Sequence, residues 1–199
     1  MGSNDVGNGG DLSRHSKNVV VKQTPCLRVV PEFLVANGEQ FSWKNRNMTE
    51  PVIVSRDINA SPQKVWEMVT DLPRMGEWSP ENQGGVWSKG ATGPAVGAKF
   101  KGRNKNGKKS WGTEVTVNVF DAPTKFSFSL MALGKNWCDW VYEVEPTATG
   151  CRVTHSWIDH RSKLADKLGK VVSGVSDRAS HNRANMEATL DNLAKAATL

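Results

Sequence analysis

The sequence lacks long apolar runs and has few cysteines, and both shortages narrow the class of protein. No apolar stretch approaches the about 20 residues needed to cross a bilayer, which excludes an integral membrane protein. Residues 1–25 hold no apolar segment of the kind found in secretory signal peptides. Only three cysteines are present, an odd number that cannot form a complete disulfide framework. We therefore expect a reduced, cytoplasmic protein.

Motifs of common catalytic and metal sites are also missing. The chain has no nucleophile elbow and no zincin motif. His155 and His160 lie an odd number of positions apart near one expected strand, so their side chains face opposite ways and cannot share a metal ion. The sequence thus predicts no metal site and no cofactor. His155 is a candidate catalytic residue without a motif to support it.

The composition is that of one ordinary globular domain with an excess of positive charge. The 199 residues include eight Trp, which a disordered chain would not carry. Lys and Arg number 26 against 20 Asp and Glu, a net charge of +6, which favours an anionic partner without identifying one. Residues 1–47 sustain neither a helical nor a strand period. We expect a flexible N-terminal tail there and a single domain over residues 48–199.

Strand patterns fill most of this domain. Ser61 and Pro62 predict a helix start, as N-cap and first helical residue. The pair Asn106-Gly107 predicts a type I′ hairpin turn, which needs positive φ at both central positions. Segments rich in β-branched or alternating apolar residues predict strands at 52–58, 84–87, 99–104, 110–120, 125–131, 139–145 and 151–159.

The C-terminal region has the period of amphipathic helices. Gly169 and Gly174 divide it into a short helix near 162–172 and a long one over about 175–197. Strand parity predicts an antiparallel sheet with an aromatic-rich inner face. Val119 is expected on this inner face as well. We expect the apolar stripe of the C-terminal helices to cover it. The element order predicts an α+β fold. The stripe consists of Leu164, Leu168, Val171, Val175, Ala179, Asn182, Met186, Leu190, Leu193 and Ala197.

Several segments carry a family resemblance: INASPQKVW (58–66), MGEWSPE (75–81), GAKFKGRN (97–104), VTHSW (153–157), and GVSDR (174–178) with His181 and Asn182. Together they resemble the START-like superfamily, and within it the bacterial polyketide cyclase/dehydrase branch of SRPBCC proteins. The resemblance covers about 51–197. It implies the helix-grip fold, in which a curved antiparallel sheet wraps around a long C-terminal helix and leaves a hydrophobic cavity. In that branch, Glu often stands where this chain has His155.

The resemblance also implies a function: binding or transport of a small hydrophobic ligand such as a lipid, a quinone or a polyketide-like molecule. One alternative is a polyketide cyclase or dehydratase in which His155, with the Asp177/His181 region behind it, moves protons. Another is an interaction protein with a vestigial cavity. The inward aromatic residues could also be ordinary core. The inward polar residues could form hydrogen bonds that fix the register of the helix on the sheet. The expected ligand-binding residues are Phe100, Asn104, Trp111, Phe128, Trp140, His155, Trp157, His181 and Asn182.

One expected hairpin carries Lys99, Lys101, Arg103 and Lys105 on its outer face. Such charges commonly keep a solvated sheet edge from aggregating. Peripheral contact with an anionic membrane is the second interpretation. We expect no nucleic-acid partner, because no aromatic residue alternates with the basic ones on that face.

Overall fold

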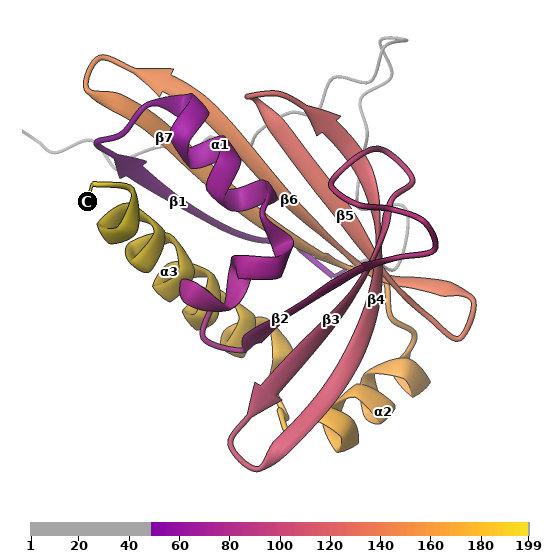
Figure 1. Cartoon of the computed structure of the whole chain (residues 1–199). Helices are drawn as coiled ribbons and strands as arrows, with labels where there is room; N and C mark the ends of the chain where they lie inside the picture. The colour runs from indigo at the N-terminus through magenta and orange to yellow at the C-terminus, as the bar shows by residue number, and fades with distance from the viewer. Residues whose placement is uncertain (1–48, 199) are drawn as a thin grey trace, which may run out of the picture. The chain divides into compact units, whose positions relative to one another are not determined.

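An antiparallel sheet of seven strands dominates the part of the chain that the computed structural model describes, residues 49–198 (Figure 1). The strand order is β1-β7-β6-β5-β4-β3-β2, so the first strand lies beside the last and every later strand pairs with its successor in the chain. The strands are β1 (Val52–Ile58), β2 (Asn82–Ser88), β3 (Lys99–Asn106), β4 (Lys109–Asp121), β5 (Lys125–Ala132), β6 (Lys135–Thr147) and β7 (Gly150–Asp159).

Helix α1 (Pro62–Thr70) follows β1 and begins where the sequence predicts. Ser61 is its N-cap, and the Ser61 hydroxyl accepts a hydrogen bond from the Lys64 backbone N–H at 3.2 Å. Pro62 occupies the first turn, where its missing N–H leaves no hydrogen bond unmade. The chain then tightens into a 3₁₀ helix over Leu72–Glu77, which leads into β2.

The predicted hairpin between β3 and β4 forms, but its turn lies one residue further along the chain. Asn106 pairs with Lys109 in the ladder, so the two-residue loop is Gly107-Lys108. Gly107 has a φ of +55° and Lys108 does not have positive φ, a pattern of a type II′ rather than a type I′ turn. The predicted turn type is therefore wrong. Asn106 stays in the ladder, and its side-chain amide donates to the Ser173 carbonyl at 3.1 Å.

A β-bulge in β4 changes which side chains face inward, so the predicted inward position of Val119 is wrong. Val117 and Val119 pair with successive residues of β5, so Asn118 between them is an extra residue. The alternation of side chains shifts at this point. Phe120, instead of Val119, packs against the core, with its ring 5.3 Å from that of Trp66.

Helix α3 (Arg178–Ala197) covers the inner face of the sheet, along β1 and beside α1 (Figure 1). The inward side of its C-terminal half is buried, since Leu190, Leu193 and Ala197 are each at most 2% exposed. The helix begins later than predicted, because Asp177 is its N-cap and accepts a hydrogen bond from the backbone N–H of Ser180 at 3.1 Å. The curved antiparallel sheet and this long helix confirm the predicted α+β helix-grip fold.

Helix α2 (Lys163–Ser173) does not bury its apolar stripe against the sheet, contrary to the prediction. Its part of the apolar stripe faces outward: Leu164 is 79% exposed and Val171 is 70% exposed. The chain turns at Gly174, which has a φ of +72° and ends α2 in the left-handed conformation. This turn separates the direction of α2 from that of α3, so α2 lies against β4 instead (Figure 1).

Two cysteines lie in the described part of the chain, Cys138 and Cys151, and both are buried and free, as the strand positions predict. They are far apart in the β6–β7 ladder, where Cys138 pairs with Asp159 and Cys151 with Pro146. No helix within residues 49–198 is long and apolar enough to cross a membrane. The predicted flexible tail over 1–47 lies outside the described residues.

Leu193→Asp should destabilise the domain by several kcal/mol, because Leu193 is fully buried and a carboxylate placed there finds no partner. Thermal and urea unfolding measure the effect. Ala184→Asp is the matched control, since it adds the same charge at an exposed position of α3 and should cost less than about 1 kcal/mol. Equal stability of the two variants would contradict the placement of α3.

Candidate functional site

A cavity of about 430 Å³ lies between the inner face of the sheet and the N-terminal half of α3. Its wall on the helix side is formed by Asn182, Asn185, Met186 and Thr189, which recur at helical spacing. The opposite wall is rich in rings because alternate positions of neighbouring strands face inward. Its aromatic residues are Phe100, Trp111, Phe128, Trp137, Trp140, Tyr142 and Trp157.

The structure places nearly all predicted ligand-binding residues around this one cavity. His181 is the exception: it lies outside the lining and contacts Glu81 and Asn185 instead. The role of these residues in binding stays a prediction. Those that line the cavity are Phe100, Asn104, Trp111, Phe128, Trp140, His155, Trp157 and Asn182.

His155 is the most unusual polar group of the lining. It is 3% exposed, and neither ring nitrogen has a hydrogen-bond partner among the described residues. Its ring stacks on Tyr142, with centroids 3.9 Å apart and planes 16° apart, and the ring of Trp140 lies 5.4 Å away. Burial lowers the pKa of His155 to about 3. The imidazole is therefore neutral near pH 7, with one nitrogen that can donate and one that can accept a hydrogen bond.

Hydrogen bonds to one sulfur hold the wall behind His155 in place. The indole N–H of the buried Trp78 donates to Met75 Sδ at 3.0 Å. The Tyr142 hydroxyl points at the same sulfur from 4.0 Å, and burial raises the pKa of that hydroxyl. The 3₁₀ helix is thus tied to β6, and the tyrosine ring beneath His155 has a fixed position.

A first ionic group borders the cavity at the start of α3. Arg178 donates to both carboxylate oxygens of Glu81 at 3.0 Å and lies over the ring of Trp111, 5.8 Å from its centroid. Both side chains of the ion pair are less than one fifth exposed. Asn182 Oδ1 lies 3.5 Å from the same guanidinium nitrogen. Arg178, which the sequence places beside the apolar stripe of this helix, reaches the cavity with its long side chain.

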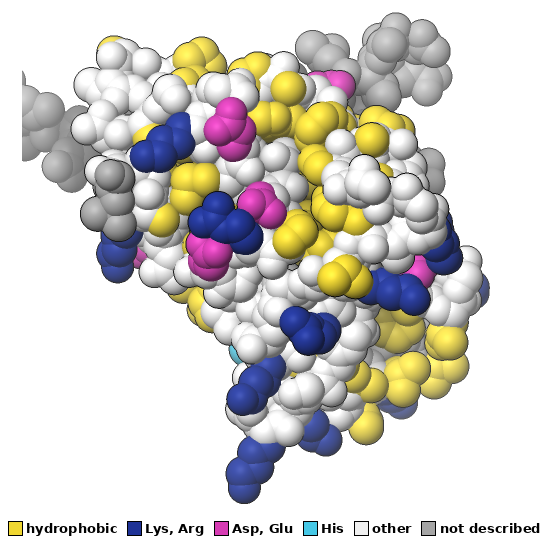
Figure 2. Space-filling view, in the orientation of Figure 1, with side chains coloured by type: hydrophobic (Ala, Val, Ile, Leu, Met, Phe, Trp, Pro, Cys, Tyr) yellow, Lys and Arg dark blue, Asp and Glu magenta, His cyan; other side chains and the backbone are white. Residues whose placement is uncertain are grey.

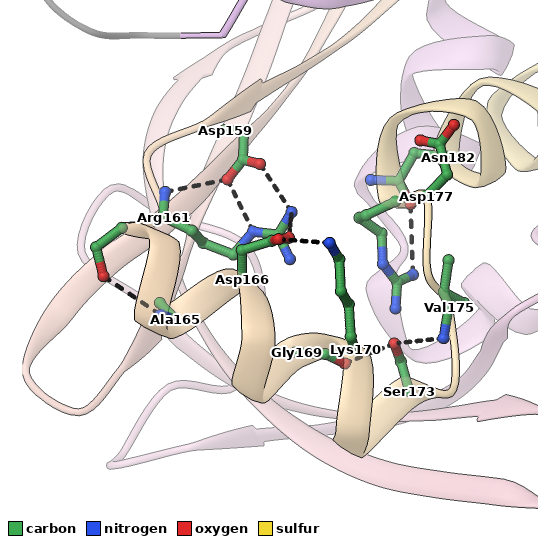
Figure 3. A network of polar contacts seen from close by, with 12 residues as sticks. Asp159, Arg161, Ala165, Asp166, Gly169, Lys170, Ser173, Val175, Asp177 and Asn182 are labelled. Atoms are coloured by element: carbon green, nitrogen blue, oxygen red, sulfur yellow. Dashed lines mark hydrogen bonds and ion pairs between the residues drawn. The ribbon is translucent and has the colours of Figure 1, made fainter.

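A second ionic group fixes the start of α2, as Figure 3 shows. Arg161 makes two hydrogen bonds to Asp159 at 2.8 and 2.7 Å and lies over the Trp157 ring, 5.6 Å from the centroid. Asp166 accepts contacts from Arg161 at 3.3 Å and from Lys170 at 2.9 Å (Figure 3). Arg161 also lines the cavity, a role that strand and helix periods did not reveal.

Little in this site suits nucleophilic or metal chemistry. Burial raises the pKa of the Cys138 thiol to about 12, which makes it a poor nucleophile near pH 7. Within residues 49–198, no group of three His, Cys, Asp or Glu side chains could hold a metal ion. Asp177, expected behind His155 in the enzymatic alternative, is exposed and caps α3.

The fold and cavity define the class of protein: a helix-grip domain with a cavity between sheet and helix. A family model described as "Polyketide cyclase / dehydrase and lipid transport" matches residues 51–198, so the chain belongs to this family. No match was found among curated protein sequences.

Solved structures share the fold. The Polyketide_cyc-like protein Cgl2372 from Corynebacterium glutamicum is 30% identical, over 73% of this chain and 89% of that one, with a TM-score of 0.51. Major latex-like protein 151 from Panax ginseng is 12% identical over 74% and 97%, with a TM-score of 0.57. Aha1 from Colwellia psychrerythraea is 14% identical over 75% and 96%, with a TM-score of 0.54. The last two show a common fold alone.

The stability of the domain should depend on pH through His155. Its pKa is about 3 in the folded state and about 6.5 in the unfolded chain. Below about pH 6.5 the unfolded state therefore binds a proton that the folded state does not, and the free energy of unfolding falls. The loss from this residue is about 2 kcal/mol between pH 7 and pH 5.

Urea unfolding of wild type and His155→Gln at both pH values measures this contribution, because the other titrating groups cancel in the difference. The free energy of unfolding of wild type, minus that of the variant, should fall by about 2 kcal/mol from pH 7 to pH 5. Parallel pH profiles would contradict a buried, neutral imidazole.

Proposed function

We propose that the chain binds a small hydrophobic molecule carrying a flat ring system and one polar group, in the cavity between the sheet and α3. The observation that carries this proposal is His155, which is neutral, buried and without a partner among the described residues. A buried polar group left unpaired costs about 1–3 kcal/mol. A ligand hydroxyl or carbonyl would pair with the imidazole and remove that cost.

The size and lining of the cavity support a ring-shaped ligand. Its volume of about 430 Å³ falls within the range of roughly 300–1,000 Å³ for small-molecule sites. This volume speaks against the alternative of a vestigial cavity. Trp111, Trp140 and Trp157 line it, and indole rings suit contact with a planar molecule.

The charges around the cavity favour a neutral ligand. Arg178 is already paired with Glu81, and Arg161 with Asp159 and Asp166. An anionic group would have to displace one of these carboxylates from its arginine. Among lipids, quinones and polyketide-like molecules, we therefore infer that a neutral quinone or polyketide-like ring is a better match than a fatty acid.

The family description also names cyclases and dehydrases, which makes catalysis the second candidate function. A general base or acid works best with a pKa near the operating pH. His155, with its pKa near 3, is far from that condition. Binding without turnover is thus the function that the geometry supports best.

Quenching of tryptophan fluorescence tests the proposal, because several Trp line the cavity. We expect 2-hydroxyanthraquinone to bind more tightly than anthracene or oleate. His155→Phe should weaken hydroxyanthraquinone binding about tenfold and leave anthracene unaffected, whereas His155→Gln should keep most of the affinity. His160→Phe, outside the cavity, is the control. No binding by wild type, or equal losses for both ligands, would contradict the proposal.

The same proteins distinguish binding from catalysis. Wild type should show no turnover of a poly-β-ketone analogue. Turnover that falls about 100-fold in His155→Gln, with affinity retained, would establish proton transfer by His155 instead.

A further inference from the structure

An exposed hydrophobic surface surrounds the mouth of the cavity. We call it the apolar rim. Leu133, Leu168 and Val172 belong to it and also line the cavity, so the cavity reaches the surface among them. Figure 2 shows hydrophobic side chains gathered over α2, which lies at the lower right of Figure 1. The members are Leu133 (82% exposed), Leu164 (79%), Leu168 (43%), Val171 (70%) and Val172 (42%).

Positive charge adjoins the apolar rim on two elements. On α2, Lys163 and Lys167 are exposed, and neither forms an ion pair with a described residue. The tip of the β3–β4 hairpin adds Lys105, Lys108 and Lys109, which are likewise exposed and unpaired within residues 49–198. Figure 2 shows this basic tip beside the hydrophobic side chains.

The hairpin and α2 are joined, so the basic and apolar residues belong to one surface. The Asn106 amide at the hairpin tip donates to the Ser173 carbonyl at the end of α2, at 3.1 Å. The only acidic side chain of α2, Asp166, is neutralised by Arg161 and Lys170. The surface therefore presents positive charge and apolar side chains together.

We infer that the apolar rim and its flanking lysines dock the protein on an anionic lipid bilayer. A helix with an apolar stripe bordered by lysines is the pattern of helices that lie in a membrane interface. The lysines would meet anionic headgroups while Leu164 and Val171 enter the apolar layer beneath them. A nucleic acid or an acidic protein would need the charges but not the exposed Leu and Val. Docking in this orientation opens the cavity toward the bilayer.

This surface differs from the membrane contact predicted from the sequence. Only Lys105 is common to both. Lys99 pairs with Glu114 at 3.7 Å, and Lys101 and Arg103 lie on the outer face of β3, opposite the cavity. The predicted set therefore lacks apolar neighbours at the cavity mouth, which α2 supplies.

Co-sedimentation of the full chain with vesicles, in the absence of any cavity ligand, tests the inference. The vesicles contain phosphatidylcholine alone or with about one third phosphatidylserine. Wild type should bind the anionic vesicles, and binding should weaken at high salt. Leu164→Gln with Val171→Gln should reduce binding about tenfold or more. The matched control is Val86→Gln with Val96→Gln, which removes two exposed valines (64% and 69% exposed) elsewhere and should bind like wild type.

Lysine variants separate charge from apolar contact. Lys163→Gln with Lys167→Gln should weaken binding to anionic vesicles, whereas Lys64→Gln with Lys195→Gln, at exposed sites on α1 and α3, should not. Each variant should have the melting temperature of wild type and bind the cavity ligand with the affinity of wild type. A loss of vesicle binding then reflects the surface alone and does not test the proposed function. No vesicle binding, or equal binding by the α2 variants, would overturn the inference. A different outcome would assign the surface to a second copy of the chain. Wild type would then self-associate with rising concentration and not bind vesicles, and Leu164→Gln with Val171→Gln would abolish the self-association.

Discussion

Helix α3 packs tightly against the sheet along only half its length, and the rest of the structure depends on this constraint. Its C-terminal half presents Leu190, Leu193 and Ala197, which are fully buried. Its N-terminal half presents Asn182 and Asn185, whose polar side chains do not fill the space against the aromatic face. One helix therefore closes the core with its C-terminal half and lines the cavity with its N-terminal half.

Charged groups border this cavity without making it an anion site. Burying an arginine is unfavourable unless it is paired and hydrogen-bonded. Each of Arg161 and Arg178 meets this condition through a carboxylate, and each covers a tryptophan ring. The two ion pairs also fasten the starts of α2 and α3. The interior of the cavity thus stays hydrophobic, while the ion pairs of Arg161 and Arg178 hold the elements at its edge in place.

The sequence predicted the α+β class, the strands and eight of the residues that line the cavity, because strand parity follows from alternation alone. Val119 was misplaced because a bulge shifts alternation without leaving a clear signal in the residues. Leu164 was expected in the core, but it is exposed. The spacing of apolar residues shows that a helix has an apolar face, and it does not show what that face packs against. Arg161 was missed because the reach of a long side chain depends on the folded backbone.

The weak attachment of α2 connects the cavity to its surroundings. Ser173 is its only buried side chain, and the helix is held by Arg161–Asp166 at one end and Asn106–Ser173 at the other. Its apolar side chains add little burial, since Leu164 and Val171 stay exposed. Opening α2 therefore costs less than unfolding the core beneath α3. The cavity that His155 lines already reaches the surface among Leu133, Leu168 and Val172, so access to it leaves the packing of the sheet against α3 intact.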